Sequence, residues 1–386
     1  MKNKNKLLIY GIIIIVIILA IFLLGAKTGL IILKKQNETI KIGAIMPLTG
    51  SIADFGIDTK MALTTAIEEI NNKKVLGKNI EIIYEDGRCD GKEALTAAQK
   101  LINIDNVDII IGGVCSTETL GMSEYVNSSK KILISPVSTS PEITSAGDYI
   151  FRTAPSDTSQ GKIIADTMIK KNQKNISIIY AKNDAYSKGI RDTFIEKYKG
   201  IGGTIVSEES YNYNLGQDTK TQIEKVLSKN PQALLIISSS PQTFDLILKR
   251  LAEIDYKDQI YTVDALMTED VIKNNKILEG SIFGRPKFDD NKEDIVNFLS
   301  KIKNEKNYSP KALPPFYFAS IYDLANIVKE GIEKCNGTTP DCIKDYLYSI
   351  KNRNGMLGNL TIDPNGDAVL EFELKIIRDG KIENIN

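Results

Sequence analysis

Hydrophobic and polar positions alternate along this chain in a way that predicts short strands followed by amphipathic helices. An apolar run at Ile42–Met46 is typical of a strand, and the loop Pro47–Gly56 follows it. Apolar residues then recur at the spacing of a helix face, at Ala62, Leu63, Ala66, Ile67 and Ile70. Asp58 stands just before this face and is expected to be its N-cap. In α/β folds, such a strand, loop and helix N-terminus form an edge at which small ligands bind.

The alternation continues to the end of the chain and divides it into two series. Further strands are predicted at Ile80–Tyr84, Val107–Gly112, Ile132–Ser135, Ile176–Tyr180, Thr204–Ser207, Ala233–Ile237, Gln259–Val263 and Gly280–Phe283. Helices are predicted at Thr117–Val126, Lys188–Tyr198, Thr219–Leu227, Thr243–Ile254, Glu269–Asn274, Glu293–Lys303 and Tyr317–Glu333. Between the two series, Phe151–Asp157 changes from apolar to polar and is expected to cross from one to the other. Two such series indicate an α/β protein of two lobes with parallel sheets.

The N-terminal segment has a different pattern. Leu7–Ala26 is a nearly unbroken apolar run, about as long as a helix that spans a bilayer. It is longer than the apolar region of an ordinary secretion signal, so we expect an uncleaved transmembrane helix in preference to a cleaved signal. Residues 1–6 would then be a cytoplasmic tail and residues 27–39 a linker. Lysines flank the run on both sides, so charge does not decide its orientation.

Composition excludes several classes of function. The chain has 386 residues, with 49 Lys and Arg against 49 Asp and Glu, and it has no histidine. A balanced charge without a basic run argues against binding to nucleic acid. The lack of histidine removes Ser-His-Asp and Cys-His catalysis and the commonest metal ligand. We therefore expect no enzyme, no cofactor and no metal site.

Four cysteines allow three pairings. Cys89 and Cys115 each follow a predicted strand, and in a doubly wound sheet of order 2-1-3 their loops meet at one edge. Cys335 and Cys342 bracket a short loop that could close locally. Four buried free thiols are the alternative, and a zinc site fits neither the spacings nor the lack of histidine. Disulfides would place the bulk of the chain outside the cytoplasm.

Six segments resemble the type I periplasmic binding proteins, in the branch that binds leucine, isoleucine and valine. They are YEDGRCD (84–90), IIGGVCSTET (110–119), ISPVSTSPEIT (134–144), FRTAPSDTSQG (151–161), NDAYSKG (183–189) and GNLTIDPNGD (358–367). Together with the opening KIGAIMPLTG, they keep their order and spacing over residues 40 to 386. The order and spacing carry the resemblance, since no single segment is decisive.

The resemblance implies two Rossmann-like lobes joined by a hinge of three crossings. Residues 40–153 and 284–352 would form lobe I, and residues 154–283 and 353–386 would form lobe II. The lobes would close over a ligand held between them. The matching cysteines are paired in that family, which implies a bridge between Cys89 and Cys115.

The family's contacts with the polar groups of an amino acid fall on loops that follow predicted strands. Ser116 begins a helix and could bind a carboxylate through its hydroxyl and the helix N-terminus, although Ser is also common as a plain N-cap. Thr139 matches the ligand-binding threonine, Val137 supplies the matching carbonyl for an ammonium, and Ser138 lies between them. A turn stabilised by local hydroxyl bonds would give the same letters. Asp264 matches a carboxylate that pairs with the ammonium, and the family often has glutamate there.

The resemblance also implies a pocket for the ligand side chain. Phe55 and Tyr186 match aromatic pocket residues, although both could be ordinary packing residues. The family often has another aromatic residue where this chain has Ser238, Ser239 and Ser240. We therefore include Ser240 in the expected site and expect a roomier or more polar pocket than one for leucine.

The function implied is an extracytoplasmic receptor that serves an ABC importer. It would be a membrane-anchored, monomeric ectodomain that binds a branched-chain or similar amino acid and delivers it to a permease. The alternative is a sensor or receptor for another small polar solute, such as an amide or an organic acid.

Overall fold

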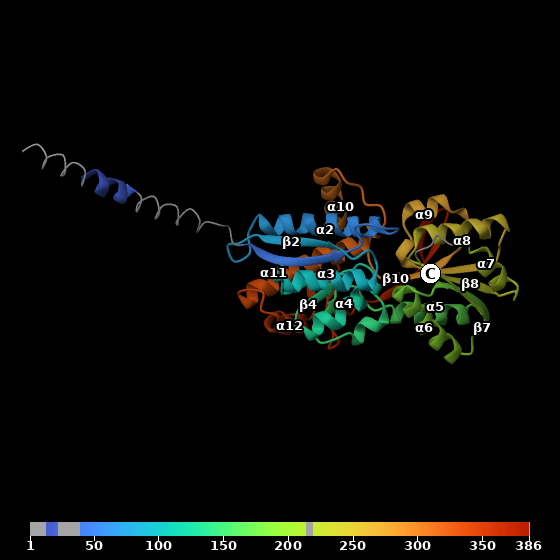
Figure 1. Cartoon of the computed structure of the whole chain (residues 1–386). Helices are drawn as coiled ribbons and strands as arrows, with labels where there is room; N and C mark the ends of the chain where they lie inside the picture. Colours follow the sequence, from blue (N-terminus) through green and yellow to red (C-terminus); the bar gives the residue numbers. More distant parts are fainter. Residues whose placement is uncertain (1–12, 22–38, 214–218, 386) are drawn as a thin grey trace, which may run out of the picture.

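The protein forms two α/β lobes that lie side by side (Figure 1). The computed structural model describes residues 13–21, 39–213 and 219–385. In this part of the chain, no helix combines the length and the apolar character needed to cross a membrane. Of the expected anchor Leu7–Ala26, only residues 13–21 are described, and they are helical. The rest of that prediction lies outside the described residues.

The first lobe is built on a sheet of five parallel strands in the order β2-β1-β3-β4-β5. These are β1 (Ile40–Met46), β2 (Ile80–Asp86), β3 (Ile109–Gly112), β4 (Ile132–Ser135) and β5 (Ile150–Arg152). Its helices are α2 (Ala53–Asn71), α3 (Gly91–Asn103), α4 (Ser116–Ser128), α10 (Glu293–Lys306), α11 (Pro315–Cys335) and α12 (Pro340–Tyr348), with the short helix η1 (Pro141–Ser145). Strands β3 and β4 are buried throughout, which explains their unbroken apolar runs.

The second lobe has a seven-stranded sheet in the order β14-β13-β10-β9-β8-β6-β7. The strands are β6 (Asn175–Ala181), β7 (Thr204–Tyr211), β8 (Ala233–Ile237), β9 (Gln259–Val263), β10 (Ile282–Pro286), β13 (Phe372–Arg378) and β14 (Lys381–Asn384). The helices are α5 (Thr158–Lys170), α6 (Ala185–Gly200), α7 (Lys220–Leu227), α8 (Pro241–Glu253) and α9 (Glu269–Asn274), with η2 (Asp264–Leu266) and η3 (Lys276–Leu278). Strands β6 to β10 are parallel, while β13 and β14 pair antiparallel at one edge.

The chain passes between the lobes at three places. Residues 153–157 lead from β5 to α5, and residues 287–292 lead from β10 to α10. The hairpin of β11 (Arg353–Gly355) and β12 (Gly358–Leu360) pairs only with itself among the described strands, and its turn is held by Asp323 of α11. The chain joins the second sheet only at β13. We therefore propose residues 361–371 as the third crossing, in place of a lobe boundary at residue 353.

Asp58 is not the N-cap that the sequence pattern predicted. Helix α2 begins at Ala53, five residues before Asp58, so Asp58 lies within the helix, where it is buried. Its carboxylate accepts the N–H groups of Lys311, Ala312 and Leu313 at 2.7 to 3.1 Å, and the hydroxyl of Tyr308 at 2.7 Å. A buried carboxylate needs such donors, so Asp58 anchors the loop before α11 to α2.

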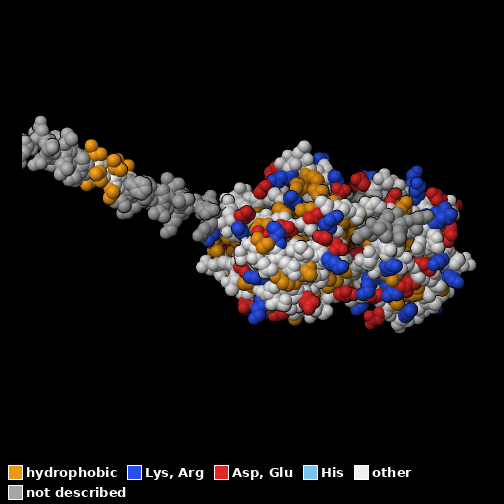
Figure 2. All heavy atoms as spheres, in the orientation of Figure 1, with side chains coloured by type: hydrophobic (Ala, Val, Ile, Leu, Met, Phe, Trp, Pro, Cys, Tyr) orange, Lys and Arg blue, Asp and Glu red, His pale blue; other side chains and the backbone are white. Residues whose placement is uncertain are grey.

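The two lobes are in direct contact along their facing loops. The amide of Ala185 donates to the Thr117 hydroxyl at 3.2 Å, and the Gln242 side chain donates to the Ser51 carbonyl at 3.0 Å. The visible surface of both lobes carries interspersed acidic and basic side chains (Figure 2). The hydrogen bonds from Ala185 and Gln242 therefore join the facing loops of the two lobes.

Candidate functional site

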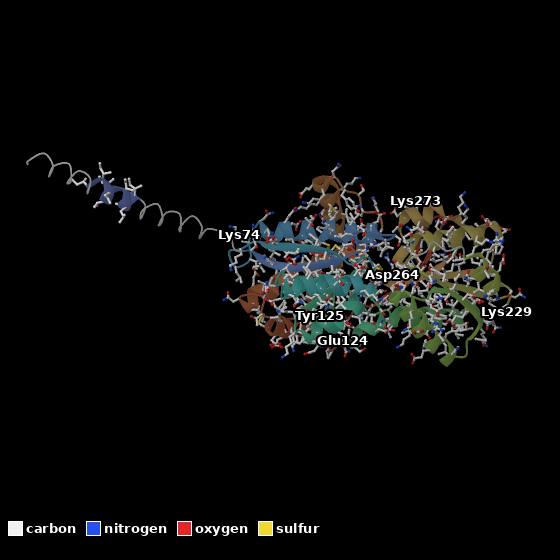
Figure 3. The ribbon with its side chains drawn as sticks, in the orientation of Figure 1. Lys74, Glu124, Tyr125, Lys229, Asp264 and Lys273 are labelled. Atoms are coloured by element: carbon white, nitrogen blue, oxygen red, sulfur yellow. A yellow bond between two sulfur atoms is a disulfide. The ribbon has the colours of Figure 1, made fainter. Side chains whose placement is uncertain are left out.

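A small cavity of about 50 Å³ lies between the lobes, and Asp264 stands where the lobes meet (Figure 3). The cavity is lined from lobe I by Ile52, Phe55, Val114, Cys115, Ser116, Val137, Thr139, Leu313 and Tyr317. Lobe II contributes Asp184, Tyr186, Tyr213, Ser239 and Ala265. Most of these residues follow the carboxyl ends of parallel strands, which is where open α/β sheets bind ligands.

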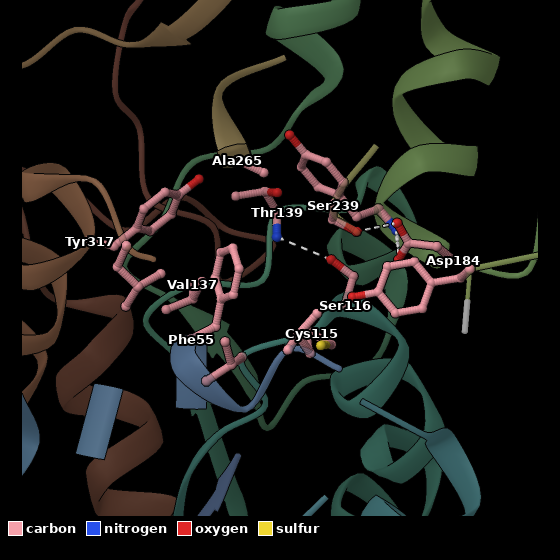
Figure 4. Close-up of a pocket in the computed structure, with 14 residues that line it drawn as sticks. Phe55, Cys115, Ser116, Val137, Thr139, Asp184, Ser239, Ala265 and Tyr317 are labelled. Atoms are coloured by element: carbon pink, nitrogen blue, oxygen red, sulfur yellow. Dashed lines mark hydrogen bonds between the residues drawn. The ribbon is translucent and has the colours of Figure 1, made fainter. Parts of the chain in front are cut away.

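Ser116 stands at the start of α4 with its side chain toward the cavity (Figure 4). Its hydroxyl oxygen accepts the N–H groups of Thr139 at 3.3 Å and Ser140 at 3.1 Å. Both bonds use the oxygen as acceptor, so the hydroxyl proton remains able to donate. The amides of the first helical turn have no intrahelical acceptor, and the helix dipole adds a positive end. This wall of the cavity therefore suits a carboxylate.

Asp264 lies under the opposite part of the cavity, at the end of β9. It is 4% exposed and accepts the Gln160 amide at 2.7 Å, the Tyr186 hydroxyl at 3.1 Å and the Tyr317 hydroxyl at 3.0 Å. Burial raises the pKa of its carboxyl, and these three hydrogen bonds oppose the rise. Two of the donors, Tyr186 and Tyr317, come from different lobes, so Asp264 joins the lobes at the cavity.

A second buried carboxylate, Asp184, lines the cavity at the start of α6. It caps the helix by accepting the amides of Tyr186 and Ser187, and it accepts the Ser239 hydroxyl at 2.7 Å. Burial raises its pKa as well, against these hydrogen bonds. Asp184 and Ser239 therefore make one wall polar.

No lysine or arginine is among the residues that line this cavity in the described chain. Arg152 is a fully buried cation. Its guanidinium donates to both carboxylate oxygens of Asp367, to the Ser140 carbonyl and to the Thr144 hydroxyl. Its donors are directed to these partners and not to the cavity. The acidic groups therefore lack a protein cation, and a guest with a positive group would supply one.

The model of a family described as periplasmic binding protein matches residues 39–374, the greater part of the chain. The chain belongs to the periplasmic binding protein family. Its relatives place it among the type I members, in the branch for branched-chain amino acids. It is a solute-binding protein of the ABC transporter type.

Three similar proteins illustrate the range of this family. The Leu/Ile/Val-binding protein of Escherichia coli (strain K12) is 30% identical over 334 residues, 86% of this chain and 88% of that protein. A leucine binding protein from Thermotoga maritima MSB8 has a TM-score of 0.79 and 25% identity, over 90% of this chain and 98% of its own. A solute binding protein from Rhodopseudomonas palustris BisB5, solved with 3,4-dihydroxybenzoic acid, has a TM-score of 0.77 at 23% identity, over 90% and 96%. The last likeness concerns the fold alone.

The structure brings most of the predicted site residues of this binding protein to one cavity. Phe55, Ser116, Val137, Thr139 and Tyr186 line it, and Asp264 lies directly behind Tyr186 and Tyr317. The roles of these residues toward a ligand remain predictions.

Three predicted residues do not line the cavity: Asp264, which lies behind Tyr186 and Tyr317, and the serines Ser138 and Ser240. The Ser138 hydroxyl bonds Thr119 at 2.7 Å and the Gly113 carbonyl at 2.8 Å, so it holds the loops beneath the site. Ser240 caps helix α8 by accepting the Thr243 amide at 3.4 Å. Its neighbour Ser239 lines the cavity in its place. Both serines instead satisfy buried backbone groups.

Sequence reasoning missed several lining residues. Tyr213 follows β7, and Leu313 and Tyr317 come from the start of α11, far along the chain. The loop that carries Leu313 is held by Asp58, which gives no local signal of its partners. Asp184 stands in the quoted NDAYSKG segment, and its position as a helix cap was the one available clue.

Both expected disulfides are present, and all four cysteines are used. Cys89 pairs with Cys115, with Cα atoms 5.4 Å apart, and Cys335 pairs with Cys342 at 5.8 Å. Beneath the first bridge, the buried Glu118 accepts the amides of Cys89 at 3.0 Å, Val114 at 3.0 Å and Cys115 at 3.1 Å. Burial raises the pKa of Glu118 to about 7 in spite of these bonds. The bridge and Glu118 together hold the loop that presents Ser116.

Proposed function

We propose that this protein binds an α-amino acid between its lobes and delivers it to an ABC permease. The observation that carries the proposal is the cavity itself. The Ser116 hydroxyl and the start of α4 line it, the buried carboxylate of Asp184 lines it close to them, and Asp264 lies behind Tyr186 and Tyr317. No basic side chain is among the lining residues. A buried carboxylate without a cation is unfavourable, whereas an ammonium of the ligand would pair with it.

The proposed orientation follows from the two ends of the cavity. The ligand carboxylate would accept hydrogen bonds from Ser116 and from the first amides of α4. The ammonium would lie near Thr139, the Val137 carbonyl and Asp264. The side chain would then contact the apolar wall that includes Phe55.

The walls also bear on which amino acid is selected. Phe55 and Leu313 favour an apolar side chain, as in the branched-chain amino acids. Ser239 and Asp184 favour a hydrogen-bond donor at the far end, as in a hydroxyl or amide side chain. They also support the second candidate, a receptor or sensor for a small amide. An organic acid is a weaker candidate, because it would place a further negative charge beside Asp264 and Asp184.

We further propose that the apolar run Leu7–Ala26 anchors the protein in the cell membrane, with residues 1–6 in the cytoplasm. The lobes would then act outside as a monomeric ectodomain, and two disulfides support that setting. A cleaved run would instead release the protein. Fractionation of cells with mass measurement of the mature chain tests this: a membrane-bound chain that retains its N-terminus supports the anchor, and a soluble, shortened chain contradicts it.

A thermal-shift screen tests the ligand. The full chain, purified in a mild detergent, is mixed with each of the twenty L-amino acids and with a set of amides and organic acids. A ligand at about 100 times its Kd stabilises by ~2.7 kcal/mol, which is a clear shift. A selective shift with one group of amino acids supports the proposal. A shift only with solutes that lack an ammonium would refute the role of Asp264.

A further inference from the structure

The start of helix α5 places two buried acceptors without partners next to the proposed ammonium site. Asp157 is 1% exposed, and its Oδ2 atom has no hydrogen-bond partner in the described structure. Gln160 is fully buried, and its Oε1 atom also lacks a partner there. The Gln160 amide meanwhile donates to Asp264 at 2.7 Å and to the Gly284 carbonyl at 2.6 Å. Buried acceptors are nearly always satisfied, so Asp157 Oδ2 and Gln160 Oε1 are available to a further hydrogen-bond donor.

Asp157 is also linked to the lining of the cavity. Its backbone amide donates to the Thr139 carbonyl at 2.9 Å, and hydrogen bonding from the Thr139 side chain favours its ionised form. Thr139 lines the cavity and Asp264 lies behind it, so Asp157 is one layer from any guest. Gln160, one turn after Asp157 at the start of α5, donates to Asp264 at 2.7 Å, so the two buried carboxylates lie near the same side chain.

The charges around this pair do not balance it. Burial is the main cause that raises the pKa of Asp157, and the charges of Asp264 and Asp184 raise it further, while Arg152 lowers it. Tyr186 and Tyr317 also face the pair, and burial together with both carboxylates raises their pKa values. Arg152 is occupied by Asp367, as described above. Two buried carboxylates that share a site cannot both ionise without a cation.

We propose that Asp157 and Asp264 together hold one proton when the cleft is empty and release it when the ligand's ammonium enters. The second half of this proposal rests on the proposed function, whereas the first half concerns the empty protein alone. The exchange conserves charge: two carboxylates with one proton carry one negative charge, and two carboxylates with one ammonium carry the same. The proton leaves to solvent. Among the described residues, no group of acidic or cysteine side chains is arranged to hold a metal ion instead.

Proton exchange also separates amino acids from solutes that lack an ammonium. An amino acid that expels a proton binds more tightly as the pH rises, as long as its own ammonium stays charged. A solute without a cation leaves the proton in place, so its affinity does not rise with pH. Asp157 thus acts as a selectivity residue through Asp264 and Thr139, without contacting the ligand.

The first test needs no ligand. Asp157→Asn keeps the size of the side chain and removes the pair's second charge. Because the folded pKa of Asp157 lies above its unfolded value, the wild-type protein loses stability as the pH rises, and the variant escapes that loss. We expect the variant to unfold at least about 2–4 °C higher than wild type near pH 8, with the gain shrinking toward pH 4.

The matched control is Asp166→Asn, on the same helix but in a surface ion pair with Lys197. It should show no difference that depends on pH. An Asp157→Asn effect that is the same at both pH values would overturn the proposal, as would a loss of stability confined to high pH.

The second test uses the wild-type chain and does not depend on the folding of a variant. Infrared spectra of the ligand-free protein at about pH 9, well above the pKa of about 7 of the buried Glu118, should contain the C=O band of a protonated buried carboxyl. Addition of L-leucine, L-isoleucine or L-threonine should remove it and release up to one proton per bound molecule, measured by calorimetry in two buffers. A ligand-free protein without that band refutes the pair. A band that persists in the absence of any amino-acid binding supports the pair and counts against the proposed function alone.

Discussion

The charge of Asp264 should account for a large part of amino-acid affinity. Asp264→Ala removes a carboxylate that is 4% exposed and takes from the ligand's ammonium the acidic partner proposed for it at that position. Removing one partner of a buried, hydrogen-bonded charge pair costs ~2–5 kcal/mol of binding free energy. At ~1.4 kcal/mol per factor of ten, that corresponds to a Kd raised by about 30-fold to 4000-fold.

The surroundings of Asp264 explain why the loss of affinity should be large but finite. Three hydrogen bonds orient Asp264, from Gln160, Tyr186 and Tyr317, so its geometry is already arranged for a cation. The Thr139 hydroxyl and the Val137 carbonyl would still accept from the ammonium in the variant, which keeps the loss finite. Asp264→Asn retains the size of the side chain and should lose nearly as much affinity, because the charge is what pairs with the ammonium.

Calorimetric titration with the amino acid that gives the largest thermal shift measures the change in Kd. Asp258→Asn is the matched control, because Asp258 precedes β9 at its exposed end while Asp264 follows the same strand. The control should bind within twofold of wild type. An Asp264→Ala variant that also binds within twofold would remove Asp264 from the site.

Four further predictions concern Ser116, the two disulfides and Glu118. Ser116→Ala should weaken amino-acid binding by ~1.5–3 kcal/mol, about 10-fold to 140-fold, since a hydrogen bond to a charged group is lost; calorimetry should show no change for Ser123→Ala, whose hydroxyl bonds its own helix. Thiols titrated in denaturant without reductant should be near zero. Replacing Cys89 and Cys115 by alanines should lower the free energy of unfolding in urea by about 3.5 kcal/mol, because that bridge joins residues 26 positions apart. Removing the bridge between Cys335 and Cys342, 7 positions apart, should lower it by about 2.4 kcal/mol. The reverse order of the two losses would contradict the chain-entropy reasoning. Burial raises the pKa of Glu118 from its ordinary value of 4.5 to about 7 in the folded protein. The free energy of unfolding should therefore fall by on the order of 3 kcal/mol as the pH rises through that interval, and Glu118→Gln should flatten this dependence.

Much of the fold could be predicted from local pattern. Strands β4, β8 and β9 have the predicted bounds, because each is buried along its length and its apolar run ends where the strand ends. Strand β7 runs on to Tyr211, beyond the predicted Ser207. It lies at the edge of its sheet and is only half-buried, so polar residues can continue the strand. The antiparallel edge of β13 and β14 had no local signal either, since strand direction depends on the pairing partner.

The candidate site was predictable only where it follows strand ends. Ser116, Val137 and Thr139 come after β3 and β4, and parallel strands bring such loops to one edge. Ser138 stands in the loop after β4 and Ser240 in the loop after β8, but their side chains bond backbone groups instead. The direction of a side chain in a loop depends on neighbours that the pattern does not contain.

The sequence by itself determined the two α/β series, the apolar N-terminal run, the cysteines able to pair and the lack of histidine chemistry. These are properties of composition and of periods two to four residues long. Tertiary structure alone decided which residues meet at the cavity, and it made Asp58 an anchor for a loop about 250 positions away and not a cap. It also brought Asp157 and Asp264, 107 positions apart by their numbers, near the same buried side chain, Gln160. The physical reason is that burial and charge pairing depend on distance in space, which the crossings between the lobes set independently of distance along the chain.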